Sequence, residues 1–263
     1  MTAATAAWTS ERLGRPYAPT VSARTYHDTG IVLRTHKLGE ADRILVVMTA
    51  EHGKVRAVAK GVRKTTSKFG GRLEPLAHVN LLVRVGRSLD VIAQAETIDH
   101  FRPLRTELGL LTHAMAMVEA IDQVAPEREP ATHLYRMLLG GLRTLAAGPS
   151  ALVVPAFYWK LLAAEGVAPE LDSCVSCGSP GPLVAFSVEE GGALCRTCRR
   201  GPGLTEAALV LLRRILGGDL VAVLREPASP TTHDVEVLAV RSLEHHLERR
   251  LRTVAMLEPT DGR

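Results

Sequence analysis

The feature that most constrains this chain is the spacing of its four cysteines. They form two Cys-x2-Cys pairs, Cys174 with Cys177 and Cys195 with Cys198, separated by 17 residues. Two such pairs with a gap of about 15–20 residues are typical of zinc-ribbon sites. Zinc takes four thiolates in a tetrahedron, and a two-residue spacer lets two sulfurs of one tight turn reach the same ion. We therefore predict one zinc ion bound by all four cysteines.

Two disulfides or free buried thiols are the alternatives for these cysteines. The N-terminal residues lack the apolar core of a secretion signal, so we expect a reducing compartment, in which disulfides are disfavoured. Four cysteines also fill the coordination shell of zinc and leave no position for water. The metal is therefore predicted to be structural rather than catalytic.

The segment between the two pairs, residues 182–195 (PLVAFSVEEGGALC), is typical of a β-hairpin that turns at Gly191–Gly192. Arg196, Arg199 and Arg200 lie beside the second pair. They could offset the negative charge of four thiolates, but we expect them to be solvated.

Residues from about 26 to 98 alternate with the period of two that is typical of β-strands. Turn-forming glycines divide this region into five expected strands, which are residues 30–36, 43–49, 53–60, 79–85 and 89–95. Five short strands of this kind favour a small closed barrel. The OB-fold is the commonest five-stranded form, and an SH3-like barrel is the alternative.

After Pro103 the apolar residues recur with the period of an α-helix. Leu111, Ala114, Val118 and Ile121 form the first apolar stripe, which ends before Pro126. Further helices are predicted over about 131–147, 155–165, 204–216 and 234–257. In the last of these, Glu248 and Arg252 are spaced to pair at i, i+4.

Together these patterns predict a multidomain α+β protein. Its fold is an N-terminal five-stranded OB-fold barrel followed by an all-α domain with an embedded four-cysteine zinc module. The predicted parts are a disordered N-terminal extension over residues 1–23, the barrel over 24–101, helical segments over 102–170 and 202–263, and the zinc module over 171–201.

The positive charge of the chain is clustered in the predicted barrel. The net charge is only +4, yet residues 24–72 hold eleven basic and four acidic side chains. Residues 60–72 (KGVRKTTSKFGGR) form a predicted loop without any acid, and a phosphate backbone is the natural partner of such a loop. The alternative is a solvated loop that only keeps the protein soluble. The candidate DNA-binding residues are Arg34, Lys37, Arg43, Lys54, Arg56, Lys60, Arg63, Lys64, Lys68 and Arg72.

Few aromatic residues accompany these cations. Phe69 is the only aromatic residue of the loop, and Tyr26 lies near the start of the barrel. Base stacking should therefore contribute less than contacts with phosphate groups. We expect weak sequence specificity and a strong dependence of binding on salt.

No motif for catalysis is present. The sequence lacks G-x-x-x-x-G-K-[ST], H-E-x-x-H and G-x-S-x-G. His245 and His246 are adjacent on a predicted helix, so they point in different directions and are interpreted as polar surface. No run approaches 18 apolar residues, so no membrane span is predicted. We therefore predict a protein that is not an enzyme.

Three segments, in order, resemble the N-terminal domain of the RecO family of bacterial DNA-repair and recombination-mediator proteins. They are LGEADRILVVMT (38–49), EHGKVRAVAKGVRKTTSKFGGRLEP (51–75) and GRSLDVIAQAE (86–96). The resemblance continues through the predicted helices and both cysteine pairs, to about residue 257. The first 23 residues depart from it, because proteins of this family typically begin close to the first strand.

The resemblance implies an OB-fold, then a helical domain with an embedded zinc module. It implies binding of single- and double-stranded DNA and annealing of complementary strands. It also implies work with RecR and the single-strand-binding protein to load the RecA recombinase, in the cytoplasm and at the nucleoid. The basic residues from Arg34 to Arg72 match the basic surface of the family in character.

Two rival hypotheses remain open from the sequence. Small barrels and zinc ribbons also occur in RNA-binding modules of translation or ribosome assembly. A zinc enzyme acting on nucleic acid is the other rival, but it needs an open metal position that four cysteines do not leave.

Overall fold

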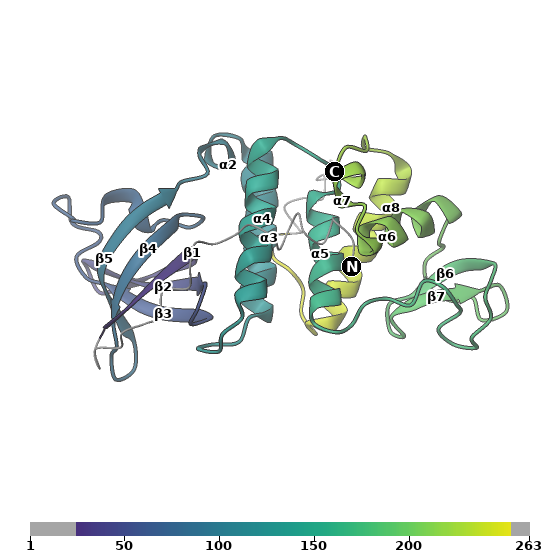
Figure 1. The fold of residues 1–263 in the computed structure, drawn as a ribbon, viewed down its shortest axis with the longest axis horizontal. Coiled ribbons are helices and arrows are strands. Elements are labelled where there is room, and N and C mark those ends of the chain that lie inside the picture. The colour runs from purple at the N-terminus through teal and green to yellow at the C-terminus, as the bar shows by residue number, and fades with distance from the viewer. Residues whose placement is uncertain (1–24, 254–263) are drawn as a thin grey trace, which may run out of the picture. The chain divides into compact units, whose positions relative to one another are not determined.

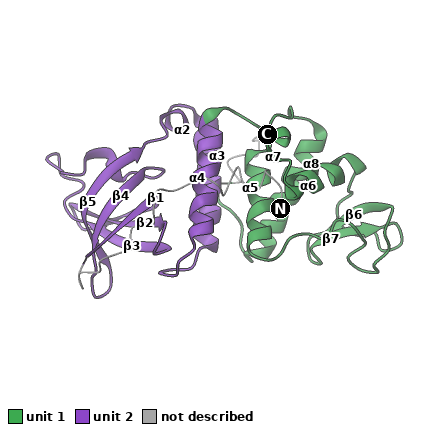
Figure 2. Ribbon diagram, viewed as in Figure 1, with its two compact units in different colours: residues 1–10, 147–263 green, residues 11–146 purple. Residues whose placement is uncertain are grey.

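The structure, a computed structural model, describes residues 25–253. Contacts between Cα atoms divide the chain into two compact units at residue 147 (Figure 2). The predicted extension over residues 1–23 lies outside the described residues. Within the described range, no helix combines the length and the apolar character that a membrane crossing needs.

The unit that comes first along the chain is purple and labelled unit 2 in Figure 2, and the one that follows it is green; they are called the first and the second unit in the text. The first unit begins with a closed barrel of five strands (Figure 1). The strands are β1 (Thr25–Leu38), β2 (Asp42–Thr49), β3 (Lys54–Ala59), β4 (His78–Arg84) and β5 (Asp90–Asp99). Their order around the barrel is β1-β2-β3-β5-β4, with β1 antiparallel to both β2 and β4 and a short parallel pairing between β3 and β5. The predicted five-stranded, OB-like barrel is confirmed.

The barrel interior is filled by the apolar side chains that alternate along each strand. Val32, Leu45, Val47 and Val79 are almost fully buried there. Phe69 joins this core from the loop between β3 and β4, just before the short 3-10 helix η1 (Gly70–Leu73), and is only 1% exposed. The loop that was predicted to be a surface feature is therefore anchored in the barrel by its aromatic residue.

Three helices complete the first unit: α2 (Arg102–Thr106), α3 (Leu108–Val124) and α4 (Thr132–Ala147). The barrel contacts α4 through two hydrogen bonds. Thr132 Oγ1 donates to the Ala50 carbonyl at 2.7 Å, and the Tyr135 hydroxyl lies 2.8 Å from His78 Nε2. In the structure these helices group with the barrel, and the five-part division of the sequence stays a prediction.

The second unit contains four helices and one hairpin. They are α5 (Val153–Ala164), β6 (Leu183–Ser187), β7 (Gly192–Cys195), α6 (Glu206–Gly217), α7 (Leu220–Val223) and α8 (Pro230–His246). Trp159 of α5 is buried at the centre, where its indole N–H donates to the Val235 carbonyl of α8 at 3.3 Å. The predicted hairpin between the cysteine pairs is confirmed.

The last helix is shorter than predicted. It ends at His246, because Leu247 caps it and Glu248 adopts a left-handed backbone with φ of 51°. The chain then turns back, and the Leu251 N–H donates to Glu244 Oε1 at 2.8 Å. The prediction of a helix beyond residue 246 is therefore wrong, and Glu248 and Arg252 do not lie on a common helix. Its last predicted residues, 254–257, lie outside the described residues.

Candidate metal centre and nucleic-acid interface

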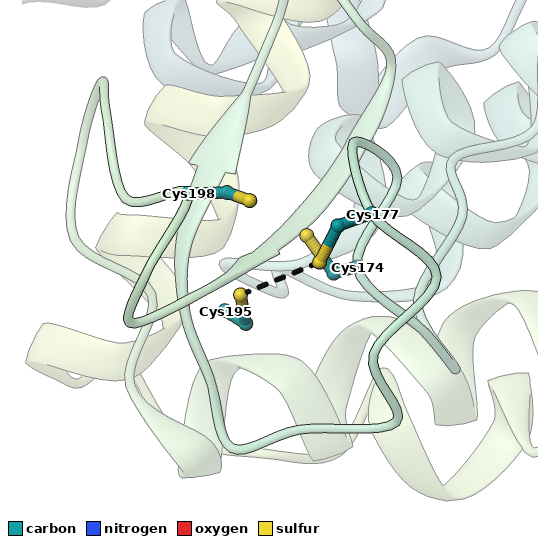
Figure 3. Close-up of side chains that lie close together, drawn as sticks. All are labelled: Cys174, Cys177, Cys195 and Cys198. Carbon is teal, nitrogen blue, oxygen red and sulfur yellow. Dashed lines mark hydrogen bonds between the residues drawn. The ribbon is translucent and has the colours of Figure 1, made fainter.

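The four cysteines converge at the base of the β6–β7 hairpin (Figure 3). All four sulfur atoms lie within 4.8 Å of one another, and Cys177 Sγ lies 3.7 Å from Cys195 Sγ. Four sulfurs at 2.3 Å from one tetrahedral zinc ion would lie about 3.8 Å apart. The sulfurs therefore have the spacing of a four-thiolate metal site.

The backbone holds the first cysteine pair in a tight turn. The Gly178 N–H donates to the Cys174 carbonyl at 2.7 Å, and the Cys174 N–H donates to the Ser179 carbonyl at the same distance. Gly178 has a φ of 74°, a left-handed conformation that strains any residue with a Cβ atom. The turn that closes at Gly178, just after Cys177, therefore holds both cysteines of this pair close together.

The thiols do not ionise independently. The backbone N–H of Cys195 donates to the Cys174 sulfur and lowers the pKa of Cys174 to about 6. The hydrogen bond with Cys177 raises the pKa of Cys198 to about 12. Four crowded sulfurs cannot all carry negative charge without a cation between them, so this donor set fits a divalent metal ion.

Arg200 links the two cysteine pairs by hydrogen bonds while its side chain stays exposed, at 48%. Its guanidinium donates to the Cys198 carbonyl at 3.0 Å and to Ser176 Oγ at 3.4 Å, and it pairs with Glu190. These three partners come together only in the tertiary fold, so no local sequence pattern could predict this role of Arg200.

Three of the ten predicted DNA-binding residues are paired with carboxylates. Arg34 Nε lies 2.7 Å from Asp122 Oδ2, and Arg43 lies 2.9 Å from Glu74. Lys54 is only 8% exposed, and its ammonium donates to the Asp122 carbonyl at 2.5 Å. The Lys54 ammonium also lies 3.7 Å from Asp122 Oδ1, so Arg34 and Lys54 share one carboxylate while Arg43 has its own. The positive charge of these three residues is therefore only partly available to a ligand. Asp122, which the sequence analysis missed, is a charged residue beside the apolar stripe of α3.

The other seven predicted cations are exposed, and no ion pair joins any of them to an acid within residues 25–253. Where their side chains have fixed partners, these are neutral backbone carbonyls. Lys68 donates to the Ala93 carbonyl at 2.8 Å, and Arg72 donates to the Lys68 carbonyl at 2.7 Å. Such bonds fix a cation without cancelling its charge. The seven are Lys37, Arg56, Lys60, Arg63, Lys64, Lys68 and Arg72.

The basic loop is joined to the turn between β1 and β2. The Arg63 N–H donates to the Ala41 carbonyl at 3.0 Å, and its guanidinium reaches the Gly39 carbonyl at 3.4 Å. On the same hairpin, Lys37 faces Arg43 across the strands. Lys37, Arg43 and the start of the basic loop therefore lie at one end of the barrel.

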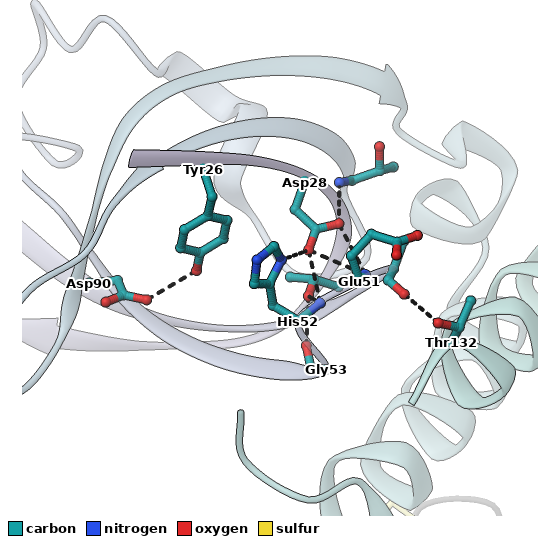
Figure 4. A network of polar contacts seen from close by, with 10 residues as sticks. Tyr26, Asp28, Glu51, His52, Gly53, Asp90 and Thr132 are labelled. Carbon is teal, nitrogen blue, oxygen red and sulfur yellow. Dashed lines mark hydrogen bonds and ion pairs between the residues drawn. The ribbon is translucent and has the colours of Figure 1, made fainter. Parts of the chain in front are cut away.

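Neither aromatic residue that the sequence offered for base stacking is free to stack. Phe69 is buried in the barrel core. Tyr26 stacks on the His52 ring with centroids 4.1 Å apart, and its hydroxyl donates to Asp90 at 3.0 Å. A buried carboxylate, Asp28, holds His52 in place by accepting from its Nδ1 at 2.6 Å and from its backbone N–H at 3.1 Å (Figure 4). The barrel therefore offers charge rather than stacking surface.

Two family models match the chain. The model for the N-terminal domain of recombination protein O matches residues 23–101, and the model for its C-terminal domain matches residues 105–255. The chain is also 44% identical over 245 residues to the DNA repair protein RecO of Cutibacterium acnes, an alignment that covers 89% of this chain and 99% of that protein. The resemblance noted in three separate segments thus extends over the barrel, the helices and the cysteine pairs, and the chain belongs to the RecO family.

Proposed function

We propose that this protein is a non-enzymatic recombination mediator of DNA repair. It binds single- and double-stranded DNA through the exposed cations at one end of the barrel. It promotes annealing of complementary strands and helps to load the RecA recombinase together with RecR. The observation that carries the proposal is that seven cations of the barrel keep their charge, and several are fixed by neutral carbonyls. Family membership and the name of the similar repair protein support it.

The arrangement suits the recognition of a phosphate backbone. Cations that are already positioned lose little side-chain entropy when they contact phosphate, and they release counterions from the DNA. Two complementary strands repel each other, so a positive surface that binds both lowers the barrier to pairing. Because the aromatic residues are engaged inside the protein, binding should depend little on sequence.

In this proposal zinc is a structural ion. Cys174, Cys177, Cys195 and Cys198 would hold it, and it would supply cohesion to a module with little core of its own. Four protein ligands leave no position for a reacting water, which agrees with a function that involves no catalysis. Metal analysis of the purified protein tests this assignment by its expected ratio of about one zinc ion per chain.

Binding and annealing of oligonucleotides over a salt series test the proposed function. The triple variant Arg63→Ala, Lys64→Ala, Lys68→Ala should weaken single-strand binding. It should reduce the slope of log affinity against log salt by about 2, since each phosphate contact contributes about 0.7. The matched control is Arg225→Ala, Arg241→Ala, Arg250→Ala, which removes the same charge from exposed positions of the second unit. Equal losses in both variants, or binding that does not depend on salt, would rule out the barrel site.

An RNA competitor of the same sequence separates this proposal from an RNA-binding role. Preference for DNA, or equal binding, agrees with the proposal, whereas a clear preference for RNA would favour a module of translation or ribosome assembly. Co-elution with RecR and with the single-strand-binding protein tests the partners that family membership suggests. Since DNA is the proposed ligand, we infer a cytoplasmic location at the nucleoid.

A further inference from the structure

Helices α2 and α4 carry arginines that the charge pattern of the barrel did not single out. Arg102 and Arg105 of α2 and Arg136 of α4 are exposed. No acid pairs with these three within the part of the chain that the structure describes. The sequence from 130 to 164, which includes all of α4, contains no acidic residue. These helices therefore add a second group of cations to the first unit.

Arg105 links this group to the basic loop. Its Nε donates to the His100 carbonyl at 2.7 Å, and its NH2 group donates to the Pro75 carbonyl at 2.6 Å. Both acceptors are neutral, so the guanidinium is fixed while its charge remains. Pro75 lies only three residues after Arg72, the last cation of the loop. The side chain of α2 thus contacts the chain segment that leaves the proposed DNA-binding loop.

The backbone around this contact is strained. Leu76, next to Pro75, has a φ of 68°, and Phe101, next to His100, has a φ of 45°. Both side chains are buried, at 1% and 2% exposure, and neither is glycine. A left-handed conformation is unfavourable for such residues, and strain of this kind tends to collect at functional sites. Both strained residues adjoin the carbonyls that hold Arg105.

Helix α4 contacts the residues around Phe101 through Tyr135. The Tyr135 hydroxyl bonds to His78 Nε2, and the His78 ring stacks on Phe101 with centroids 6.5 Å apart. Phe101 is the N-cap residue that directly precedes α2. Arg136 follows Tyr135, and its exposed side chain lies outside the buried face that Tyr135 occupies. Arg136 therefore belongs to the same region of the first unit as α2.

We propose that Arg102, Arg105 and Arg136 bind the phosphate backbone of a DNA strand beyond the basic loop and so lengthen the DNA site of the barrel. This inference rests on the proposed function, because it extends the same binding surface. A strand held at the loop by Lys68 and Arg72 continues past Pro75 onto α2 and then α4. A phosphate backbone is favoured over an acidic peptide, since the three cations continue a surface that is already proposed to bind phosphate.

The length of the DNA distinguishes this second segment from the loop. We would measure binding of oligothymidylates from about 4 to about 32 nucleotides, which bracket the roughly 4–16 nucleotides that one OB-fold covers. The variant Arg102→Gln, Arg105→Gln, Arg136→Gln should bind the shortest strands as the parent protein does. On long strands it should lose most of the gain in affinity, and its salt slope should fall by about 2.

A second variant guards against structural damage. Arg102→Gln, Arg136→Gln leaves the two hydrogen bonds of Arg105 intact, and its salt slope on long strands should fall by about 1.4. Unchanged length dependence in this double variant would overturn the inference. The loop variant Arg63→Ala, Lys64→Ala, Lys68→Ala should instead lose affinity at every length. Failure of the parent protein to bind even long strands would contradict the proposed function itself, so the two failures differ.

Discussion

The Phe186 ring meets the Trp159 indole edge-on, with ring centroids 5.8 Å apart. Phe186 belongs to strand β6 of the cysteine hairpin, and Trp159 belongs to α5. Both side chains are buried, and the Trp159 indole N–H reaches α8 through the Val235 carbonyl. The hairpin that presents the cysteines is thus packed directly on the core of the helical unit.

Loss of the metal should therefore destabilise the second unit first. In Cys174→Ser, Cys177→Ser, or after chelation, we expect the free energy of unfolding of this unit to fall by several kcal/mol, because zinc binding contributes to folding. A loss of about 2 kcal/mol would already lower its melting temperature by roughly 10 °C. Trp159 fluorescence reports this transition in a Trp8→Phe background, because the chain has only two tryptophans.

The first unit supplies the control for that experiment. DNA binding should persist in the cysteine variant at a temperature where Trp159 has already become exposed. A single unfolding transition that removes both signals together would show that the metal stabilises the whole chain. That outcome would contradict the assignment of zinc to the second unit alone.

His78 predicts a loss of stability in mild acid. Burial, with a contribution from the Arg143 guanidinium, lowers the pKa of His78 to about 4 from an ordinary value of 6.5. Between these values the unfolded chain binds more protons than the folded chain, so the free energy of unfolding falls as the pH is lowered from 6.5 towards 4. The full effect is about 3 kcal/mol.

The variant His78→Gln isolates this effect, since glutamine cannot titrate but can still bond to the Tyr135 hydroxyl. Urea unfolding of the first unit, equilibrated at each pH and read by a pulse of protease at neutral pH, gives the free energy for both proteins. The difference between them should change by about 2–3 kcal/mol from pH 7 to pH 4.5. A difference that stays constant with pH would mean that the pKa of His78 is the same in the folded and the unfolded chain.

Asp122 predicts a strong coupling between the barrel and α3. The variant Asp122→Asn leaves the buried Lys54 ammonium without its counter-charge, and burial already lowers the pKa of Lys54. We expect a loss of about 3–5 kcal/mol in the free energy of unfolding of the first unit. The double variant Lys54→Met, Asp122→Asn removes both charges and should recover at least half of the lost free energy of unfolding. A double-mutant cycle in which the two losses simply add would show that the pair is not coupled.

Two glycines provide a matched test of how the barrel meets the segment before α4. Gly53 and Gly61 have nearly the same φ, 69° and 67°. A Cβ atom on Gly53 would lie 1.8 Å from the Glu129 carbonyl oxygen, whereas one on Gly61 would meet nothing closer than Lys64 Cδ at 3.7 Å. Gly61→Ala should cost about 1 kcal/mol from backbone strain alone, and Gly53→Ala at least about 3 kcal/mol. If urea unfolding showed that Gly53→Ala and Gly61→Ala lose the same free energy of unfolding, the close contact of Gly53 with Glu129 would be contradicted.

Features of the fold that depend on local sequence patterns could be predicted from the sequence. Alternation along the strands predicted the barrel, and the cysteine spacing predicted a cluster whose sulfurs now lie within 4.8 Å of one another. The sequence could not show which cations pair with a carboxylate, because the partners of Arg34 and Arg43 lie 88 and 31 residues away in the chain. The early end of α8 was missed for a similar reason. Burial of Leu251 and its bond to Glu244 outweigh the helical periodicity beyond His246.

Strand β1 pairs with two other strands, and this pairing affects the order in which the barrel forms during synthesis. This strand pairs with β2 through a short turn but also with β4, where Thr25 faces Arg84. The chain must therefore leave the ribosome well beyond β4 before its first strand has both neighbours. Until then one edge of β1 is available to other chains, which makes this stage the one most prone to aggregation. Helices with local contacts form much faster, so we expect barrel closure to set the pace of refolding, measurable as slow recovery of DNA binding after dilution from urea.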